Sequence, residues 1–295
     1  MIVCTIQIPF SAALESNNHV IDLCTQSLER CTENMDIILL PIYSDYPNFD
    51  RLPIAVEKTA KRCGSWVVVD LFMESIHGKQ RTTLLYDPQG EVTRTHHKSH
   101  RTGFSRKEQG SIVFDMGGVR VGFITCFDMH FPEYLAQLAR WNLDVILLTS
   151  EERGEEPELL ETQHRYCAMI TNAYVLRYMA SNEGTSELGG HAVLISPDGK
   201  VARNLEKEAG LQVYSIADPK NKRILSNSAG EATLRACEVL EARRQPWNYR
   251  PAGSFVVPGD DLVPYPRICA HRGFNTVAPE NTMPAFASAI ALGTD

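Results

Sequence analysis

The chain reads VGFITCFDMHFPE over residues 121–133, and this segment changes character at its middle. Residues 121–125 are apolar or β-branched and predict a buried strand, whereas Pro132 and Glu133 are typical of the first turn of a helix. Cys126 therefore lies at a sharp strand-to-helix turn. Backbone amides at such a turn can polarise a carbonyl group, and nearby positive charge lowers the pKa of the thiol. Cys126 is a candidate nucleophile, and a buried core thiol is the evenly matched alternative.

Strands and helices alternate on both sides of this segment. Apolar and β-branched runs predict strands at residues 2–8, 36–41, 66–72, 82–86, 91–97, 119–125, 144–148, 191–196 and 201–205. Helical spacing of apolar residues predicts helices near residues 21–28, 51–63, 132–141, 156–172 and 231–244. Asp87–Gly90 and Pro197–Lys200 are turn sequences that each close a hairpin. The alternation predicts an α/β protein whose helices cover the faces of its sheets.

Composition and charge narrow the class of protein. The 295 residues are 43% hydrophobic and 22% charged, which suits one large domain or two small ones. Against 36 acidic residues there are 29 lysines and arginines, and the formal charge of -7 favours a small-molecule ligand over nucleic acid or an anionic membrane. The absence of a membrane-length apolar run or of a basic leader after Met1 predicts a cytoplasmic protein. Eight scattered cysteines with no CxxC pair are expected to be reduced thiols that hold no metal.

A basic segment precedes the cysteine. Residues 95–100 read THHKSH, and the two-residue period of a strand places His96, Lys98 and His100 on one face. A lysine on that face can stabilise the oxyanion of a tetrahedral intermediate, where one preorganised donor is worth about 3 kcal/mol. A solvated basic strand and a zinc site are the alternatives, and the second lacks any HxxxH motif or cysteine pair.

Taken together, these features resemble the nitrilase family of carbon-nitrogen hydrolases. Pro41 at a strand end, Lys98 after a hairpin, and CFD at residues 126–128 with PE at 132–133 follow the order and spacing of that family. The resemblance covers nearly all of residues 1–255. It implies a four-layer α-β-β-α sandwich, usually assembled through dimers, and a triad of glutamate, lysine and cysteine that needs no metal or organic cofactor.

The resemblance also assigns roles to single residues. It makes Cys126 the nucleophile and Lys98 its supporting cation, and it places Phe127 and Asp128 against the substrate. The family carries a second glutamate between the lysine and the cysteine, for which Glu108 is the candidate, with a solvated charged loop as the alternative. Because Asp128 follows the cysteine by two residues, the amidase and carbamoyl-hydrolase branches are favoured over true nitrilases. The expected ligand is a small amide or carbamoyl compound.

One residue departs from the family pattern. The residue after Pro41 should be the general-base glutamate, and this chain has Ile42. A positioned base contributes about a hundredfold to ten-thousandfold in rate, and an apolar neighbour raises a thiol pKa by desolvation. Two hypotheses stay open. The chain is an amidase that is weakened, or rescued by another carboxylate such as Asp45, or it is an inactive relative that binds a ligand or anchors an assembly.

The last thirty residues resemble a different family. The sequence PRICAHRGF at 266–274, followed by APENT at 278–282, is similar to the opening of a glycerophosphodiester phosphodiesterase. We therefore expect a carbon-nitrogen hydrolase domain at 1–257, a linker at 258–265 and the start of a phosphodiesterase domain at 266–295. Such enzymes are TIM barrels of about 250 residues, so the tail supplies one strand and one helix and is expected to be inactive. Fusion, truncation and decay are alternative origins of this tail.

Overall fold

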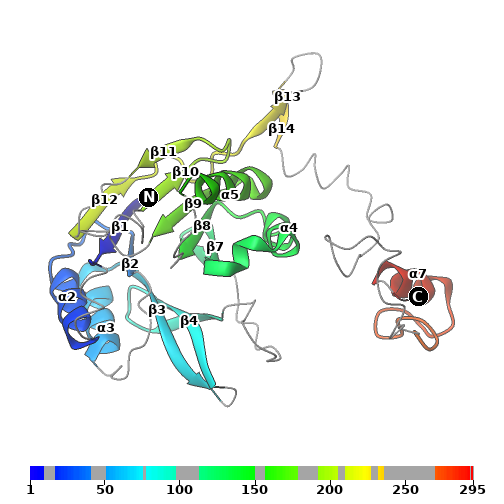
Figure 1. Cartoon of the computed structure of the whole chain (residues 1–295), viewed down its shortest axis with the longest axis horizontal. Helices are drawn as coiled ribbons and strands as arrows, with labels where there is room; N and C mark the ends of the chain where they lie inside the picture. Colours follow the sequence, from blue (N-terminus) through cyan, green and yellow to red (C-terminus); the bar gives the residue numbers. More distant parts are fainter. Residues whose placement is uncertain are drawn as a thin grey trace. The chain divides into compact units, whose positions relative to one another are not determined.

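The computed structural model describes most of the chain in segments. These are residues 1–9, 17–40, 51–75, 78–97, 113–149, 157–178, 192–204, 210–226, 232–235, 270–292 and 294. The chain divides into two compact units, Met1–Val239 and Leu240–Asp295, which are described separately (Figure 1). The linker predicted at 258–265 lies outside the described residues.

The first sheet has six strands in the order β12-β1-β2-β3-β4-β5. Their bounds are Gly210–Ser215 for β12, Ile2–Gln7 for β1, Ile37–Leu40 for β2, Trp66–Ser75 for β3, Gly78–Tyr86 for β4 and Val92–His97 for β5. β1, β2 and β3 are parallel, and β12 pairs antiparallel with β1. Because β3 to β4 and β4 to β5 are both antiparallel, β5 runs in the same direction as β3. The hairpin predicted to turn at Asp87–Gly90 is confirmed.

The second sheet has six strands in the order β11-β10-β9-β8-β7-β6. Their bounds are Val201–Asn204 for β11, Val193–Ile195 for β10, Tyr174–Tyr178 for β9, Val145–Thr149 for β8, Val119–Thr125 for β7 and Val113–Met116 for β6. β7, β8 and β9 are parallel, and β10 returns antiparallel to β9. β6, β9 and β12 were not predicted from the sequence.

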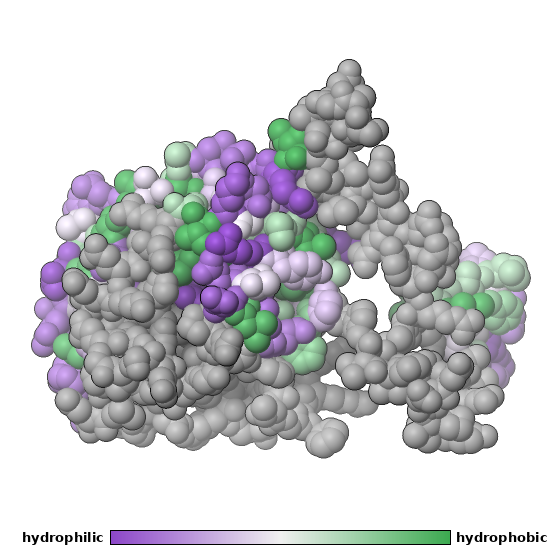
Figure 2. All heavy atoms as spheres, turned by 45° about the horizontal axis from the view of Figure 1, so that its top comes forward, coloured by the Kyte–Doolittle hydropathy of each residue, from purple (hydrophilic) through white to green (hydrophobic). Residues whose placement is uncertain are grey.

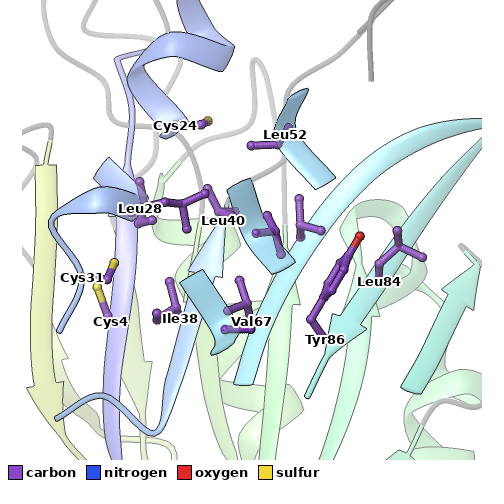
Figure 3. Packing of buried hydrophobic residues seen from close by; sticks show 14 of the residues in the cluster. Cys4, Cys24, Leu28, Cys31, Ile38, Leu40, Leu52, Val67, Leu84 and Tyr86 are labelled. Atoms are coloured by element: carbon purple, nitrogen blue, oxygen red, sulfur yellow. The ribbon is translucent and has the colours of Figure 1, made fainter. Parts of the chain in front are cut away.

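Alternating side chains divide the strands between three apolar clusters. On one face of the first sheet, Cys4 and Leu40 pack with residues of α2 (Asn17–Glu29) and α3 (Arg51–Cys63), as Figure 3 shows. On its other face, Val3, Leu39 and Val68 pack between the sheets against Phe123, Leu147 and Leu176. Beyond the second sheet, Ile124 and Ile146 pack with α4 (Pro132–Arg140) and α5 (Pro157–Thr171). The predicted four-layer α-β-β-α sandwich is therefore confirmed.

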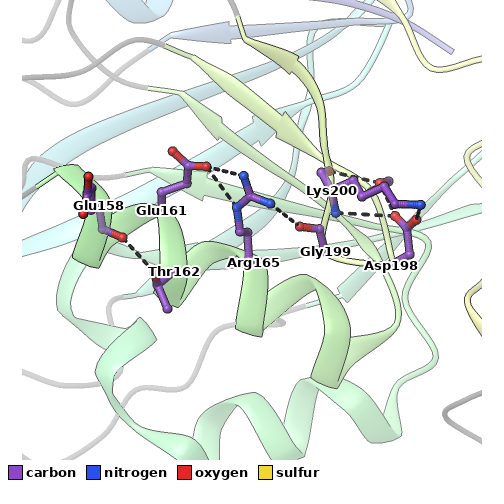
Figure 4. A network of polar contacts seen from close by, with 8 residues as sticks. Glu158, Glu161, Thr162, Arg165, Asp198, Gly199 and Lys200 are labelled. Carbon is purple, nitrogen blue, oxygen red and sulfur yellow. Dashed lines mark hydrogen bonds and ion pairs between the residues drawn. The ribbon is translucent and has the colours of Figure 1, made fainter.

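Polar contacts attach α5 to the β10–β11 hairpin. Arg165 donates from Nη1 to the carbonyl of Gly199 at 3.2 Å and pairs with Glu161 one turn earlier (Figure 4). Gly199 has a φ of +79°, and a Cβ there would lie 2.9 Å from the side chain of Met169. In the same turn, hydrogen bonds from Lys200 and then Ser196 lower the pKa of Asp198 to about 2. The turn predicted at Pro197–Lys200 is confirmed, and it requires glycine.

The helix predicted at 231–244 is wrong over the part that the structure describes. Ala232–Arg235 forms β14, which pairs antiparallel with β13 (Ile224–Ser226). The ladder with the preceding strand satisfies the backbone groups of this segment, and such tertiary pairing overrides a weak helical preference. Residues 236–244 lie outside the described residues.

The second unit contains the helix expected of the tail. α7 spans Met283–Ala291, and Thr282 caps it by accepting a hydrogen bond from the amide of Ala285. Residues 270–282 form turns, so no strand is found in the described part of this unit, and residues 266–269 lie outside it. Hydrophobic residues gather on this unit in Figure 2. Among the described residues of this unit, the large hydrophobic side chains that are exposed are those of Val277, Met283, Phe286, Ile290 and Leu292.

Across the described segments, the search for a helix of sufficient length and hydrophobicity to cross a membrane found none.

Candidate active site at the carboxyl ends of the strands

The three residues that the family resemblance singles out each follow the end of a strand. β2 ends at Leu40, two residues before Ile42; β5 ends at His97, directly before Lys98; and β7 ends at Thr125, directly before Cys126. β2 and β5 run in the same direction, so Ile42 and Lys98 follow the same edge of the first sheet. Ile42 and Lys98 themselves lie outside the described residues.

Two hydrogen bonds join the carboxyl edges of the two sheets. Tyr178, the last residue of β9, donates its hydroxyl to Oδ2 of Asp70 in β3 at 2.8 Å. Gln7, the last residue of β1, accepts from the amide of Ala192 at 3.1 Å. Because Ala192 precedes a strand antiparallel to β9, both bonds lie where the parallel strands of each sheet end. The ends of β2, β5 and β7 therefore share one side of the sandwich, where ligands of open α/β sheets bind.

The layer between the sheets becomes polar toward this side. Near the amino ends of the strands it is lined by apolar residues such as Val3, Val68 and Val145. Near the carboxyl ends the same faces carry buried polar side chains, namely Thr5, Gln7, Asp70, Thr83, Thr125, Thr149 and Tyr178. Burying polar groups costs free energy unless they are hydrogen-bonded. We call these seven residues the polar floor.

One carboxylate organises the centre of the polar floor. Asp70 accepts a hydrogen bond from the hydroxyl of Thr83 on the neighbouring strand β4, in addition to that from Tyr178. Burial, followed by the negative charge of Asp70, raises the pKa of Tyr178 well above its usual range, while the hydroxyl of Thr149 opposes that rise. Tyr178 therefore remains a protonated donor, and the contact fastens the two sheets at the site.

The hydroxyl of Thr125, like that of Thr5, is a polar-floor group that lacks a hydrogen-bond partner among the described residues. It belongs to the residue that precedes Cys126, its side chain is 1% exposed, and it has no hydrogen-bond partner among the described residues. A buried hydroxyl without a partner costs about 1–3 kcal/mol, so it points to a group that a ligand or water would satisfy.

The turn at Cys126 confirms the local prediction. Thr125 is extended, with φ -116° and ψ 108°, and Cys126–His130 then forms a 3-10 helix that leads to α4. Asp128 is completely buried in this turn. The side chains of Cys126 and Phe127 lie outside the described residues, as does Glu108 entirely. The catalytic roles of Cys126, Lys98 and Glu108 and the substrate contacts of Phe127 and Asp128 therefore remain predictions.

A second polar cluster lies on the helix side of the second sheet. Nε2 of Gln163 is 3.4 Å from Nδ1 of His130, the last residue of the 3-10 helix. Beside it, burial first, and then the positive charges of Arg177 and His130, lower the pKa of His164 well below its usual value. The carbonyl of Leu160 opposes this shift weakly. His164 is therefore a neutral imidazole, and the cluster supports the turn from the side opposite to the polar floor.

Sequence reasoning missed Asp70, Tyr178 and His164. Asp70 interrupts the apolar run WVVVDLF at residues 66–72, and a carboxylate inside a buried strand is the signal that could have marked it. Tyr178 and His164 carry no comparable signal, because their partners come from distant strands. In the segments that the structure describes, no group of three or more histidine, cysteine or acidic residues could hold a metal ion.

The fold and the site together define a class of protein. It is a four-layer α-β-β-α sandwich with a cysteine at the end of a parallel strand, above a polar layer between two sheets. Comparison with known families matches residues 27–220 to the carbon-nitrogen hydrolases. The chain belongs to the carbon-nitrogen hydrolase family.

Two curated relatives are named 2-oxoglutaramate amidase. The protein from Paenarthrobacter nicotinovorans is 26% identical over 139 residues, which cover 43% of this chain and 47% of the relative. The protein from Bacillus subtilis (strain 168) is 22% identical over 211 residues, which cover 62% and 79%. The chain thus spans about half the length of the first relative.

Solved structures of one amidase share the fold. A cysteine-to-alanine mutant of the Nesterenkonia AN1 amidase, from the nitrilase superfamily, has a TM-score of 0.62 at 21% identity, covering 75% of this chain and 92% of that one. A glutamate-to-leucine mutant of the same amidase has a TM-score of 0.59 at 20% identity, again covering 75% and 92%. In that mutant, the acetamide moiety of fluoroacetamide is covalently added to the active-site cysteine.

Proposed function

We propose that this protein hydrolyses the carbon-nitrogen bond of a small amide or carbamoyl compound, with Cys126 as nucleophile. The observation that carries this proposal is the position of Cys126 at the end of β7, beside a buried polar floor that both sheets contribute. The two relatives named 2-oxoglutaramate amidase support an amide substrate and make 2-oxoglutaramate the first compound to test.

The proposed reaction proceeds through a thioester. The thiol of Cys126 loses its proton, and the sulfur attacks the amide carbon to give a tetrahedral intermediate whose oxyanion the Lys98 ammonium stabilises. The carbon-nitrogen bond breaks, and ammonia or an amine leaves after taking up a proton. Water then attacks the thioester, which releases the carboxylic acid and regenerates the thiol. The replacement of the family's glutamate by Ile42 affects the proton transfers and not the binding of the oxyanion.

Ile42 predicts slow turnover. Without a glutamate at that position, the proton must pass to water or to another carboxylate, for which Asp45 and Glu108 are the candidates. A positioned base typically contributes about a hundredfold to ten-thousandfold, so we expect activity reduced by up to that factor. In the Nesterenkonia variant leucine replaces a glutamate, and the active-site cysteine still carries a covalently added acetamide moiety, which supports a reactive thiol at Cys126 without a glutamate at position 42.

The second candidate function is a binding or assembly module that has lost catalysis. Ile42 favours this second function directly, because it stands in place of the one carboxylate that the family triad requires. If the chain is such a module, the candidate active site binds an amide ligand but Cys126 completes no turnover.

Ammonia release decides between these functions. The chain, Ile42→Glu and Cys126→Ala are compared at matched concentration on 2-oxoglutaramate and a panel of small amides and carbamoyl compounds. Turnover by the chain that Cys126→Ala abolishes supports a working amidase, and turnover by Ile42→Glu alone supports the disabled form. Release by Cys126→Ala at the level of the unchanged chain would contradict the proposed thioester mechanism, which needs this thiol.

Assembly is proposed as a homodimer or a higher homo-oligomer, following the family resemblance. Trp141, Leu159 and Tyr166 are exposed on or beside α4 and α5. On the face shown in Figure 2, however, hydrophobic and hydrophilic residues of the first unit are interleaved in small groups. Sedimentation of the full chain measures the state: a mass of 33.0 kDa at micromolar concentration would contradict a dimer.

The tail is proposed to be the start of a glycerophosphodiesterase domain. The resemblance implies acid-base and phosphate-binding roles for the His271–Arg272 pair. His271 is exposed, and Arg272 pairs with Glu280 at 2.8 Å, so both residues lie in one turn region. Incubating this chain with a glycerophosphodiester should yield no glycerol phosphate, whereas a longer chain that continues the barrel should produce it. Absence of cleavage by the longer chain would favour decay over fusion.

A further inference from the structure

Three cysteines that the proposed reaction does not use converge on the helix side of the first sheet. Cys4 lies in β1, Cys31 lies two residues beyond the end of α2, and Cys63 is the last residue of α3. All three are buried in the same apolar cluster, and all three are free thiols. Cysteines from three separate elements thus share one small region.

Two of these thiols are in direct contact. The Cys4 and Cys31 side chains are hydrogen-bonded to each other, and their sulfur atoms face one another in Figure 3. The Cys31 thiol also lies 3.5 Å from the carbonyl oxygen of Ser27 in the last turn of α2. A disulfide needs sulfur atoms that face each other from side chains directed toward one another, and this pair meets that condition.

The surroundings make the two thiols unequal. Arg62 donates to the carbonyl of Cys31 at 2.7 Å and to that of Leu28 at 2.8 Å, which holds a guanidinium beside this segment. The hydrogen bond from Cys4 first, and then the charges of Arg62 and Arg30, lower the pKa of Cys31, although burial opposes this. The hydrogen bond to Cys31 and burial raise the pKa of Cys4. Cys31 is thus the better nucleophile, and Cys4 is the protonated partner.

We propose that Cys4 and Cys31 form an oxidation site that closes to an intramolecular disulfide when the protein meets hydrogen peroxide. The Cys31 sulfur attacks one peroxide oxygen, the O–O bond breaks, and a sulfenic acid and water form. The Cys4 sulfur then attacks the sulfenic sulfur, the S–O bond breaks, and a second water leaves with the Cys4 proton. Two thiols and one peroxide give one disulfide and two waters, and the two electrons pass from the sulfur atoms to the peroxide.

The disulfide would tie β1 to the segment that follows α2. It closes a loop between residues 4 and 31 and restricts the unfolded chain, so the oxidised protein should resist denaturation better than the reduced protein. Cys63 lies close enough for its charge to raise the pKa of Cys4, and burial, with a smaller effect from Cys31, raises the pKa of Cys63 itself. It is therefore the poorer attacking thiol, and the Cys4–Cys31 bond should dominate over any bond to Cys63.

The test uses the full chain and peptide mass spectrometry. The protein is treated with hydrogen peroxide in its native state, the remaining thiols are alkylated in denaturant, and the digest is searched for crosslinked cysteine peptides. We expect a Cys4–Cys31 peptide with a mass loss of two hydrogen atoms, and a higher urea midpoint for the oxidised protein. Cys24→Ala is the matched control, because Cys24 lies in the same cluster and burial alone perturbs its pKa.

Each outcome of this experiment either supports or overturns the proposed Cys4–Cys31 oxidation site. A Cys4–Cys31 crosslink that persists in Cys24→Ala and disappears in Cys31→Ser supports the site. Recovery of Cys4 and Cys31 as alkylated thiols from a sample whose Cys126 is already oxidised would overturn it, as would a dominant crosslink to Cys63. The measurement on the unchanged chain is decisive even if Cys31→Ser fails to fold. None of these readouts depends on amidase activity.

Discussion

The bond between Tyr178 and Asp70 offers a direct test of how the two sheets are held together at the site. Tyr178→Phe removes one hydroxyl and keeps the ring that fills the layer between the sheets. Asp70 then loses a donor at 2.8 Å, although it keeps the hydrogen bond from Thr83. A buried hydrogen bond to a charged group is worth about 1.5–3 kcal/mol, so we expect the free energy of unfolding to fall by that amount.

The same substitution should change the alkaline stability of the protein. The pKa of Tyr178 is raised in the folded state, whereas an unfolded tyrosine ionises near pH 10. Above about pH 10 the unfolded chain releases a proton that the folded protein keeps, so the unchanged protein loses up to about 1.4 kcal/mol per pH unit from this group. Tyr178→Phe lacks this group. The stability difference between the two proteins should therefore shrink as the pH rises above 10.

Urea unfolding followed by circular dichroism at pH 8 and at higher pH measures both effects. Tyr174→Phe is the matched control, since Tyr174 lies in the same strand and packs against the same cluster as a partly buried side chain. The reasoning is refuted if Tyr178→Phe costs no more than Tyr174→Phe, or if the difference stays constant through the alkaline range. The second unit of the chain is identical in all variants, so its contribution cancels.

Three other substitutions test separate parts of the structure. His164 is buried and its pKa is lowered, so below about pH 6.5 the unfolded chain binds a proton that the folded protein does not, and the free energy of unfolding should fall by up to about 1.4 kcal/mol per pH unit. His164→Gln should flatten this slope in urea titrations, and an unchanged slope would contradict the prediction. Lys222→Met removes the buried ammonium that lies 3.1 Å from Asp144, and thermal and urea unfolding should show a loss of about 3–5 kcal/mol in the free energy of unfolding. A loss below about 1 kcal/mol, the value of an exposed pair, would mean that the pair is not buried in solution. Cys126→Ala should abolish ammonia release at an unchanged urea midpoint, and a shifted midpoint would indicate a structural role for the thiol.

Apolar and β-branched runs made most of the sandwich predictable. The strands of residues 2–8, 36–41, 66–72 and 119–125 alternate between a helix-facing side and an inter-sheet side, and the structure places them as β1, β2, β3 and β7. The position of Cys126 directly after a strand was also predictable, because the apolar run ends one residue before it. A local sequence pattern is enough to predict a strand that packs only against the neighbouring layers of the sandwich.

Long-range pairing was not predictable in the same way. Residues 232–235 have a composition that a helix tolerates, and only their pairing with Ile224–Ser226 makes them a strand. Asp70 and Tyr178 are separated by 108 positions and belong to different sheets, so no local pattern could join them. The polar floor is therefore a property of how two sheets face each other, which a reading of single segments cannot supply.

The polar floor bears on the choice between an amidase and a scaffold. An assembly module gains nothing from a polar layer in the centre of its core, since each buried polar group without a partner costs about 1–3 kcal/mol and apolar residues would pack there at no such cost. This chain keeps a buried carboxylate at Asp70 and a hydroxyl at Thr125 that has no partner among the described residues, beside the turn that carries Cys126. Such a cost is tolerated where a ligand offsets it, so the polar floor favours the binding of a polar ligand over a scaffold role. Under the proposed function, Ile42 replaces the base and leaves the polar floor unchanged, so we expect Ile42→Glu to restore proton transfer and leave ligand affinity nearly unchanged.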